Sequence, residues 1–415
     1  MDARNEILER IDARRDEWLT LLSDLVRRPS ENPPGDTRAA ADCLADYLRR
    51  QGYAPEIVEP RPGMVNVVAV AERGGGRSVI LNGHLDTFPV GDRNGWERDP
   101  FSGDVVDGKI YGRGVSDMKA GTTASLIAFC LLSELRPSWR GRLTFAAVAD
   151  EETMGPWGAN YLVDHHPRLR ADGVLIGEPS TPSTVRFGEK GMVWFALTAR
   201  GQMGHSAYPH HGWNAIFEIA AALAELREME AVAWPVPEEF LKRIDEARAS
   251  TTALLGPGTT DVLSSLTVNA GVIAGGTKIN LIADHCRVEV DVRMPPGVTT
   301  ADVLRIIGRV VRRHRGMSYE LIQRSEPNWT PPSHEFLQTV QATATAVRGE
   351  APFFNISGPG TDSRVFRRAG MPVAVFGPTP YFLGGANEHV TVPDYLDVIR
   401  VHALSALEFL TTGSA

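Results

Sequence analysis

Short apolar segments alternate with helical segments along residues 1–180 of the chain. Segments of this length and composition are typical of buried strands, and their alternation with helices predicts a mostly parallel sheet covered on both faces. The clearest of them are Ser78–Gly83, Leu143–Ala149 and Gly173–Ile176. Since ligands bind such sheets beyond the carboxyl ends of the strands, the same pattern predicts the fold class, α/β, and the place of the site.

Polar side chains follow each of these strands directly. His84 and Asp86 come after the first strand, and because side chains alternate along a strand they point the same way. An imidazole beside a carboxylate suits a metal ligand and the group that orients it. The alternative interpretation is a surface turn in which the His-x-Asp pair occurs by chance. Acidic residues elsewhere in the chain must decide between this turn and a metal site.

Four of these side chains together make a mixed nitrogen and oxygen donor set: His84, Asp117, Glu152 and Glu178. Such donors suit Zn²⁺, Mn²⁺ or Co²⁺, and shared carboxylates can hold two ions about 3.5–4 Å apart. Glu151 points to a different side from its neighbour Glu152, so it is the candidate general base. The alternative interpretation is that residues 150–152 are a run of solvated charges. Their position directly after an apolar strand argues against this alternative.

The pattern changes after residue 187. Strand-like runs at Met192–Ala199, Ser264–Ile273 and Cys286–Val292, with a helix beginning at Asn214, indicate a small α+β unit. Alternation of helices and strands resumes after Thr299. We therefore expect a discontinuous catalytic domain of residues 1–187 and 298–415, and an inserted lid domain of residues 188–297.

Composition narrows the function classes. A chain of 415 residues is long enough for two domains, and its net charge of −8 argues against nucleic acid as a partner. Its three cysteines have neither metal nor redox spacing, which favours a reducing compartment. Because the first residues are charged and no stretch reads as a membrane span, we expect a cytoplasmic protein with no membrane partner.

Several motifs occur in a characteristic order along the chain: Gly83-His84-Leu85-Asp86, Gly112 to Lys119, Glu151-Glu152, Gly177-Glu178-Pro179, Gly204-His205-Ser206-Ala207-Tyr208-Pro209 and Gly275 to Asn280. The ordered set resembles the metallohydrolase family of acetylornithine deacetylase, succinyl-diaminopimelate desuccinylase, aminoacylase and the glutamate carboxypeptidases. This resemblance covers nearly the whole chain. It implies a zinc-peptidase-like catalytic domain and a smaller domain that also forms a homodimer.

The resemblance implies a role for each ligand. His84 and Glu178 would bind a first divalent ion, and Glu152 would bind a second. Asp117 would bridge the two ions, with a cis peptide bond to Met118. The cofactor would be one or two divalent ions, zinc or else manganese or cobalt.

The resemblance also implies catalytic and substrate-binding residues. Glu151 would be the general base and later the acid, and Asp86 would orient His84. His205 would stabilise the oxyanion from the smaller domain. The residues that would contact a substrate carboxylate are Arg293, Asn280 and Arg364.

One position departs from the family pattern. The family usually has a histidine three residues before an Asn-Glu or Asp-Glu pair, where it binds the second metal ion. Here the pair is Asn387-Glu388 and the matching position is Gly384, while the nearest histidine is His389. Three interpretations stay open: the enzyme uses one ion, His389 or another group completes the site, or the reaction differs from amide hydrolysis.

The function implied by these motifs is hydrolysis of an amide C–N bond in a small carboxylate-bearing substrate, with deacylation of an N-acyl amino acid as the first expectation. One alternative is an aminohydrolase that acts on a non-peptide C–N bond, of which an aromatic one is a case. The other is a catalytically inactive binding protein of the same fold, which the retention of Glu151 and His205 argues against.

Overall fold

The protein is described by a computed structural model in which residues 2–135 and 139–412 are placed. The chain forms two compact units. Unit 1 comprises Met1–Phe187, Thr330–Asn355 and Thr361–Ala415, and unit 2 comprises Gly188–Trp329 with Ile356–Gly360. Each unit has its own sheet and is described by itself.

The sheet of unit 1 is mixed, with strand order β1-β2-β6-β3-β7-β15-β8 and with β14 paired to β8. The strands are β1 (Glu56–Arg61), β2 (Met64–Arg73), β3 (Ser78–His84), β6 (Gly141–Val148), β7 (Gly173–Ile176), β8 (Thr184–Glu189), β14 (Phe353–Ser357) and β15 (Val373–Val375). Parallel pairing joins β3 to β6 and β7, and β7 to β15. The α/β class with a mostly parallel centre is therefore confirmed.

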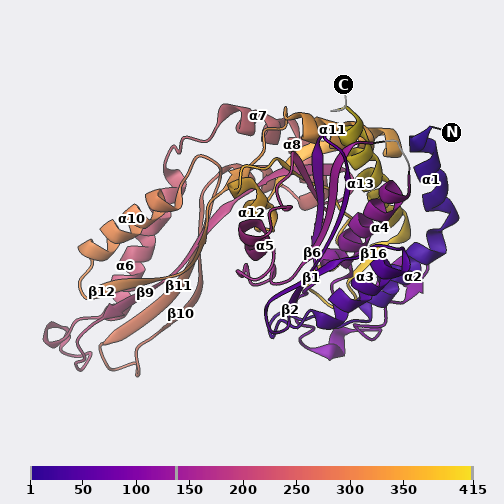
Figure 1. Ribbon diagram of the computed structural model, residues 1–415. Coiled ribbons are helices and arrows are strands. Elements are labelled where there is room, and N and C mark those ends of the chain that lie inside the picture. Colours follow the sequence, from indigo (N-terminus) through magenta and orange to yellow (C-terminus); the bar gives the residue numbers. More distant parts are fainter. Residues whose placement is uncertain (1, 136–138, 413–415) are drawn as a thin grey trace. The chain divides into compact units, whose positions relative to one another are not determined.

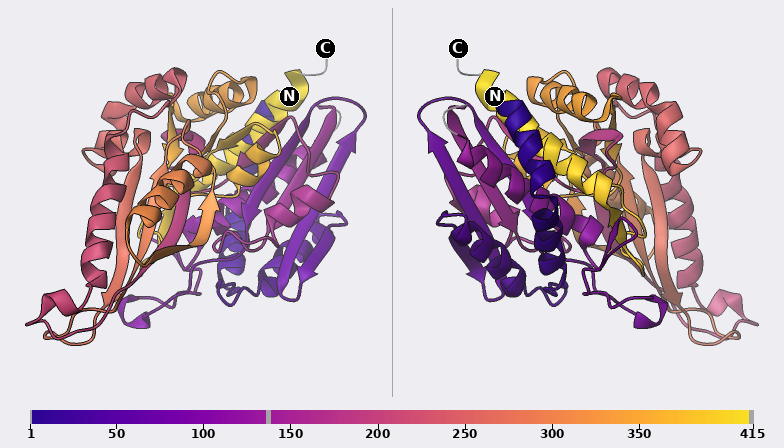
Figure 2. Two further views of the ribbon diagram at one scale, coloured as in Figure 1. Left: turned by 90° about the vertical axis from the view of Figure 1, so that its left-hand side faces the viewer. Right: turned by 90° about the vertical axis from the view of Figure 1, so that its right-hand side faces the viewer.

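Helices cover both faces of this sheet. Helices α4 and α13 lie on one side of the strands, and α5 and α12 lie on the other (Figure 1). The helices of unit 1 are α1 (Ala3–Ala13), α2 (Arg15–Val26), α3 (Arg38–Arg50), α4 (Ala120–Glu134), α5 (Ala159–His165), α11 (Glu335–Arg348), α12 (Ser363–Arg368) and α13 (Val392–Thr412). Because both faces are covered, Val79, Ile80 and Leu81 in β3 are all buried, which explains the continuous apolar run in the sequence. Figure 2 shows α1 lying beside α13.

Helix α4 is buried on nearly every side. The stretch Val115–Glu134 has the length and composition of a membrane span, contrary to the expectation that no stretch of the sequence does. In the structure 94% of its most apolar window is buried inside the protein. It packs between the strands of unit 1 and helices α2 and α13, so it is a core helix here.

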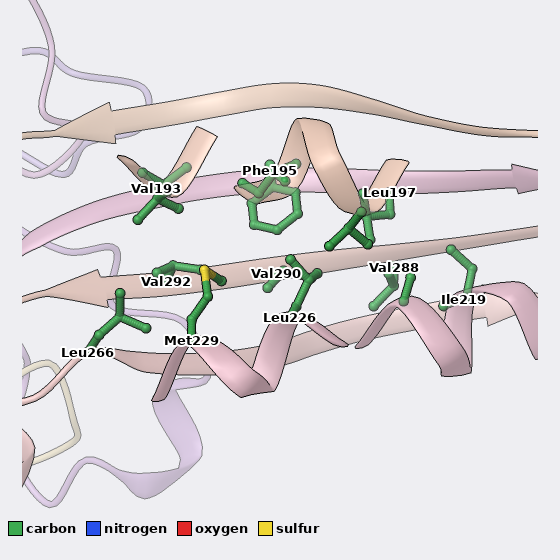
Figure 3. Close-up of a cluster of buried hydrophobic side chains, with 14 of the residues drawn as sticks. Val193, Phe195, Leu197, Ile219, Leu226, Met229, Leu266, Val288, Val290 and Val292 are labelled. Atoms are coloured by element: carbon green, nitrogen blue, oxygen red, sulfur yellow. The ribbon is translucent and has the colours of Figure 1, made fainter. Parts of the chain in front are cut away.

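Unit 2 is built on an antiparallel sheet with strand order β10-β11-β9-β12. Its strands are β9 (Gly191–Arg200), β10 (Thr267–Gly275), β11 (His285–Met294) and β12 (Met317–Ser325), and its two longer helices are α6 (Ala215–Arg227) and α10 (Thr300–Arg313). Side chains such as Phe195, Val290 and Leu226 meet between the sheet and these helices (Figure 3). Alternate residues of β11 are buried, as expected for a sheet with one covered face, whereas the central strand β9 is buried at most of its positions.

The expected return to the catalytic domain at residue 298 differs from the structure. Residues 298–329 belong to unit 2, because β12 pairs with β9 along its whole length and Val303, Ile307 and Val310 of α10 enter the same core. Helix α10 begins with a capping box between Thr299 and Asp302, which fixes its start. The helix and strand were read correctly as elements, but only their tertiary pairing decides to which unit they belong.

A buried histidine in α13 predicts a pH dependence of stability. The His402 ring is fully buried, with Nε2 2.7 Å from the backbone oxygen of Phe376 and Nδ1 3.1 Å from Ser125 Oγ. Burial lowers the pKa of this imidazole from 6.5 to about 4, against the opposing effect of the hydrogen bond to Phe376. The unfolded chain therefore takes up a proton at His402 before the folded chain does, so stability is lost as the pH falls from 6.5 toward 4.

We expect the free energy of unfolding to fall by up to about 3 kcal/mol more over this pH window in the wild type than in His402→Gln. The glutamine amide can still donate to Phe376 but does not titrate. Urea unfolding of the metal-free proteins at a series of pH values measures the difference. Parallel pH profiles for the two proteins would rule out His402 as the source.

Candidate metal centre

The carboxyl ends of β3, β6 and β7 meet at one edge of the unit 1 sheet. His84 is the last residue of β3 and lies opposite Val148, the last residue of β6. The Asp150-Glu151-Glu152 turn follows β6, and Glu178 follows β7. Parallel pairing therefore brings side chains that are far apart in the sequence to the same place.

The Nε2 atom of His84 faces three carboxylates. It lies 3.2 Å from Asp117 Oδ1, 3.6 Å from Glu178 Oε1 and 4.0 Å from Glu151 Oε2. Candidate ligand atoms form two groups, each lying within 4.8 Å: His84, Asp117 and Glu152 in one, and His84, Glu151 and Glu178 in the other. His84 is the only imidazole in either group among the described residues.

The donor set fits a divalent cation. Glu152 Oε1 and Glu178 Oε1 are buried and have no hydrogen-bond partner among the described residues. Burial, with the neighbouring negative charges, raises the pKa of Glu151 to about 8 and that of Glu152 to about 11. Buried carboxylates crowded in this way need a positive charge beside them to stay ionised, and one nitrogen with several oxygens is a donor set for Zn²⁺, Mn²⁺ or Co²⁺.

Asp86 has a different role from the one the sequence suggested. The His84 Nδ1 atom lies 2.8 Å from the backbone oxygen of Asp86, and the Asp86 carboxylate is farther away, at 3.7 Å. Since a carbonyl only accepts, the neutral ring carries its proton on Nδ1 and presents the Nε2 lone pair to the carboxylates. The backbone of Asp86, not its side chain, thus orients the histidine.

The Asp86 carboxylate holds the turn that carries the two glutamates. It accepts hydrogen bonds from the backbone N–H groups of Glu151, at 3.2 Å, and Glu152, at 3.1 Å. It also accepts from Asn32 Nδ2 at 2.8 Å, and the same amide lies 3.3 Å from Asp150 Oδ1. Sequence reasoning missed Asn32, because Asn-Pro-Pro-Gly has the composition of an ordinary loop.

The turn bearing Asp117 is held by Glu388. Glu388 Oε1 accepts from the backbone N–H and hydroxyl of Ser116, at 3.0 and 2.8 Å, and Oε2 lies 2.6 Å from Arg113 Nη1. The Asp117–Met118 peptide bond is cis, as the resemblance implied. Gly114 has φ +75°, and a Cβ there would come within 2.1 Å of Thr87, so only glycine fits this turn. Glu388 of the Asn-Glu pair thus stabilises the turn that carries the candidate ligand Asp117. The sequence did not indicate this contact.

His389 lies in β16 (His389–Thr391), which pairs with β5 (Lys109–Tyr111). Its ring stacks on Tyr381 with centroids 4.9 Å apart, and its Nδ1 lies 2.9 Å from the backbone oxygen of Asn387. It belongs to neither candidate ligand group of the described residues. The backbone oxygen of Gly384 accepts from Arg113 Nη2 at 2.9 Å, so the Arg113 side chain joins this loop to the segment that precedes Asp117.

Arg364, expected to contact substrate, is next to the candidate base. It lies in α12, and its Nη1 is 3.3 Å from Glu151 Oε1 and 2.6 Å from the backbone oxygen of Thr361. Both side chains of the ion pair are buried, so the pair is weakly screened by solvent. The guanidinium therefore fixes one oxygen of Glu151 while the other faces His84.

The candidate residues of unit 2 fall in two places. The backbone of His205 pairs with that of Leu281, beside Asn280, and His205 Nδ1 accepts from the backbone N–H of Ala207 at 3.1 Å. Strand β11 begins at His285, five residues after Asn280. Arg293 lies eight positions further along this strand, or about 27 Å from His285. Its Nε is 3.0 Å from Asp291. Within this unit Arg293 therefore lies toward the other end of β11 from Asn280 and from His205, whose backbone pairs with Leu281.

A sheet that gathers an imidazole and several buried carboxylates at its strand ends is the architecture of a metal-dependent hydrolase. The chain belongs to peptidase family M20/M25/M40, whose family model matches residues 80–408. It is thus a metal-dependent amidohydrolase that acts on C–N bonds, and the resemblance seen in the sequence is confirmed.

Individual relatives cover almost the whole chain. The succinyl-diaminopimelate desuccinylase of Cereibacter sphaeroides is 31% identical over 405 residues, which is 94% of this chain and 96% of the relative. The enzyme of the same name from Bordetella avium is 30% identical over 399 residues, with 92% and 95% covered. Among solved structures, the M20 family metallo-carboxypeptidase Sso-CP2 from Sulfolobus solfataricus has a TM-score of 0.80 at 18% identity, covering 95% of this chain and 99% of that one.

Proposed function

We propose that this protein removes the acyl group from an N-acyl amino acid by hydrolysis. The observation that carries the proposal is the position of Glu151, whose carboxylate lies inside the ligand cluster, held by Arg364 on one side and facing His84 on the other. The desuccinylase names of the relatives support an N-acylated, carboxylate-bearing small molecule as the substrate class. Neither alternative, the aminohydrolase or the inactive binding protein, has comparable support.

His84, Asp117, Glu152 and Glu178 would hold the divalent ion. When bound, it would supply a Lewis acid for the substrate carbonyl and lower the pKa of water toward ~7. Glu151 would take the proton of the attacking water and later give it to the leaving nitrogen. Arg364 would keep the Glu151 carboxylate in place through both proton transfers.

His205 is proposed to donate to the oxyanion that forms on the carbonyl oxygen. Because its Nδ1 accepts from the Ala207 N–H, the neutral ring carries its proton on Nε2, which is the donor such a role requires. Asn280 and Arg293 are proposed as contacts of a substrate carboxylate. Asn280 precedes β11 and Arg293 lies near the far end of that strand, so they would serve different parts of a substrate or of a dimer.

A panel of N-acyl amino acids tests the proposed reaction directly. The expected result is equal amounts of free amino acid and carboxylic acid, measured together by mass spectrometry. Release of ammonia without a carboxylic acid would favour the aminohydrolase. Bound metal without any turnover would favour the inactive binding protein.

We propose that one divalent ion binds per chain, since the two ligand groups share the imidazole of His84 and Gly384 supplies no side chain. Elemental analysis after reconstitution with zinc, and separately with manganese or cobalt, is expected to give one equivalent for the wild type. In His84→Ala both groups lose their nitrogen donor, so we expect a loss of affinity of more than about 100-fold. His165→Ala removes an exposed imidazole and serves as the control. Two equivalents in the wild type, or normal metal content in His84→Ala, would contradict this assignment.

We propose that the protein is a homodimer in the cytoplasm, joined through unit 2. Strand β10 is an edge strand that exposes Val272 and Ile273, and the adjacent helix α6 exposes Phe217, 73% of which is accessible. Exposed apolar side chains next to an unpaired strand edge are typical of an interface between subunits. The unpaired thiols of Cys43, Cys130 and Cys286 agree with a reducing compartment.

Light scattering coupled to size-exclusion chromatography is expected to give the mass of a dimer for the wild type and of a monomer for Phe217→Glu/Ile273→Lys. The matched control is Ile57→Lys, which alters an exposed apolar residue of unit 1. A wild-type monomer, or a dimer that survives both substitutions, would contradict the proposed interface.

A further inference from the structure

An exposed apolar surface lies beside the candidate metal centre in unit 1. Three consecutive residues, Tyr381, Phe382 and Leu383, are exposed, with 66% of Phe382 accessible. Phe88 is exposed as well, and its ring lies 3.6 Å from where a Cβ on Gly384 would be. We call these four side chains the apolar patch. Exposure of adjacent large apolar groups is unfavourable in water and marks a surface that binds something.

The loop that carries the patch is fixed on both sides. The backbones of Tyr381 and His389 pair with each other, and the Tyr381 ring is parallel to the His389 ring, with an interplanar angle of 2°. A tight turn is closed by the Gly385 N–H, which donates to the Phe382 oxygen at 2.8 Å. Ordered apolar side chains lose little entropy when a ligand covers them, so the patch is suited to binding.

The patch is attached to the segments that carry the metal ligands. Phe88 is four residues after His84, which places their Cα atoms within about 14 Å even in a fully extended chain. The other side of the patch is tied to the Asp117 turn, because Arg113 donates to both Gly384 and Glu388, and Glu388 accepts from Ser116. The patch is therefore linked to the centre both through the segment after His84 and through the Asp117 turn.

We propose that the apolar patch is a specificity subsite that receives a hydrocarbon group of the substrate, either in its acyl chain or in its amino-acid side chain. The proposal rests on the proposed function. Because Gly384 has no side chain, the flank of Phe88 stays uncovered and Phe382 and Leu383 can meet the same group. The protein would thus prefer N-acyl amino acids with an aliphatic or aromatic part over those that are small or charged throughout.

Two substrate series test the subsite. One varies the acyl group on a single amino acid, using acetyl, succinyl, hexanoyl and phenylacetyl; the other varies the amino acid under one acetyl group, using alanine, aspartate, leucine and phenylalanine. In at least one series we expect kcat/KM of the zinc-loaded wild type to be about tenfold or more higher for the apolar members. Phe382→Ser and Leu383→Ser are expected to reduce this ratio about tenfold, whereas Ile57→Ser, an exposed residue of β1, leaves it unchanged.

The outcomes separate the two proposals. Turnover without a preference for apolar groups, or a preference that survives both loop substitutions, overturns the subsite and leaves the deacylase function standing. Absence of turnover on every compound overturns the proposed function and the subsite with it. A second copy of the chain is the other group that could cover the patch, and light scattering on Phe382→Ser tests it. A changed mass with an unchanged ratio of kcat/KM values would assign the patch to a contact between two copies of the chain.

Discussion

Replacing Glu151 with glutamine is expected to lower kcat by about 10²- to 10⁴-fold while the metal content stays at the wild-type value. The amide has the shape of the carboxylate and can still accept from Arg364 Nη1, which lies 3.3 Å from Glu151 Oε1 in the wild type. It cannot take a proton from water or return one to the leaving nitrogen. The substitution therefore removes the proton transfer and keeps the surroundings.

Single-turnover kinetics and elemental analysis on the same preparation measure both effects. The matched control is Glu350→Gln, which alters an exposed glutamate two residues after α11. A Glu151→Gln variant with normal kcat would show that another group is the base. A variant that loses its metal would instead show that Glu151 is a ligand, as its place in the second ligand group allows.

Replacing Arg113 with methionine is expected to lower the free energy of unfolding by about 3–5 kcal/mol. Arg113 and Glu388 form an ion pair at 2.6 Å in which each side chain is only 1% exposed. Burial raises the pKa of Glu388, against the lowering effect of Arg113, so loss of the guanidinium leaves a carboxylate with an uncompensated charge. Since Glu388 holds the Asp117 turn, metal affinity should fall as well.

Urea unfolding of the metal-free protein separates the stability effect from the metal. Arg49→Met breaks the exposed pair with Asp46 and is expected to change stability by less than about 1 kcal/mol. The double variant Arg113→Met/Glu388→Leu should recover part of the loss, because no buried charge remains. A loss for Arg113→Met as small as that for Arg49→Met would refute the structural role of the pair.

The sheet and its ligand-bearing edge were predictable because their signals are local. The segment Gly173–Ile176 coincides with β7, and Ser78–Gly83 differs from β3 by one residue. Strands buried on both faces are continuous apolar runs, and a polar residue marks the point where the strand leaves the core. The positions of His84, Glu151 and Glu178 at one edge follow from those runs and from parallel pairing.

The contacts that hold the site were not predictable, because they join distant segments through side-chain geometry. The Arg113–Glu388 pair connects residues 275 positions apart, and Asn32 reaches Asp86 from a loop. Asp86 was expected beside the His84 ring because the two share a strand face. Its carboxylate turns instead toward backbone N–H groups of another segment, which no sequence pattern records.

Two carboxylates outside the proposed ligand set, Asp86 and Glu388, hold the backbone of the turns that carry Glu151, Glu152 and Asp117. Each carboxylate accepts hydrogen bonds from backbone N–H groups near the cluster that water would otherwise accept. The turns therefore keep their conformation without a bound cation. The centre is thus preorganised: an arriving ion meets donors already in place and gives up little of its binding free energy to order them. Chelation and reloading should then be a fast, reversible exchange of a cation, in contrast to domains that must refold around theirs.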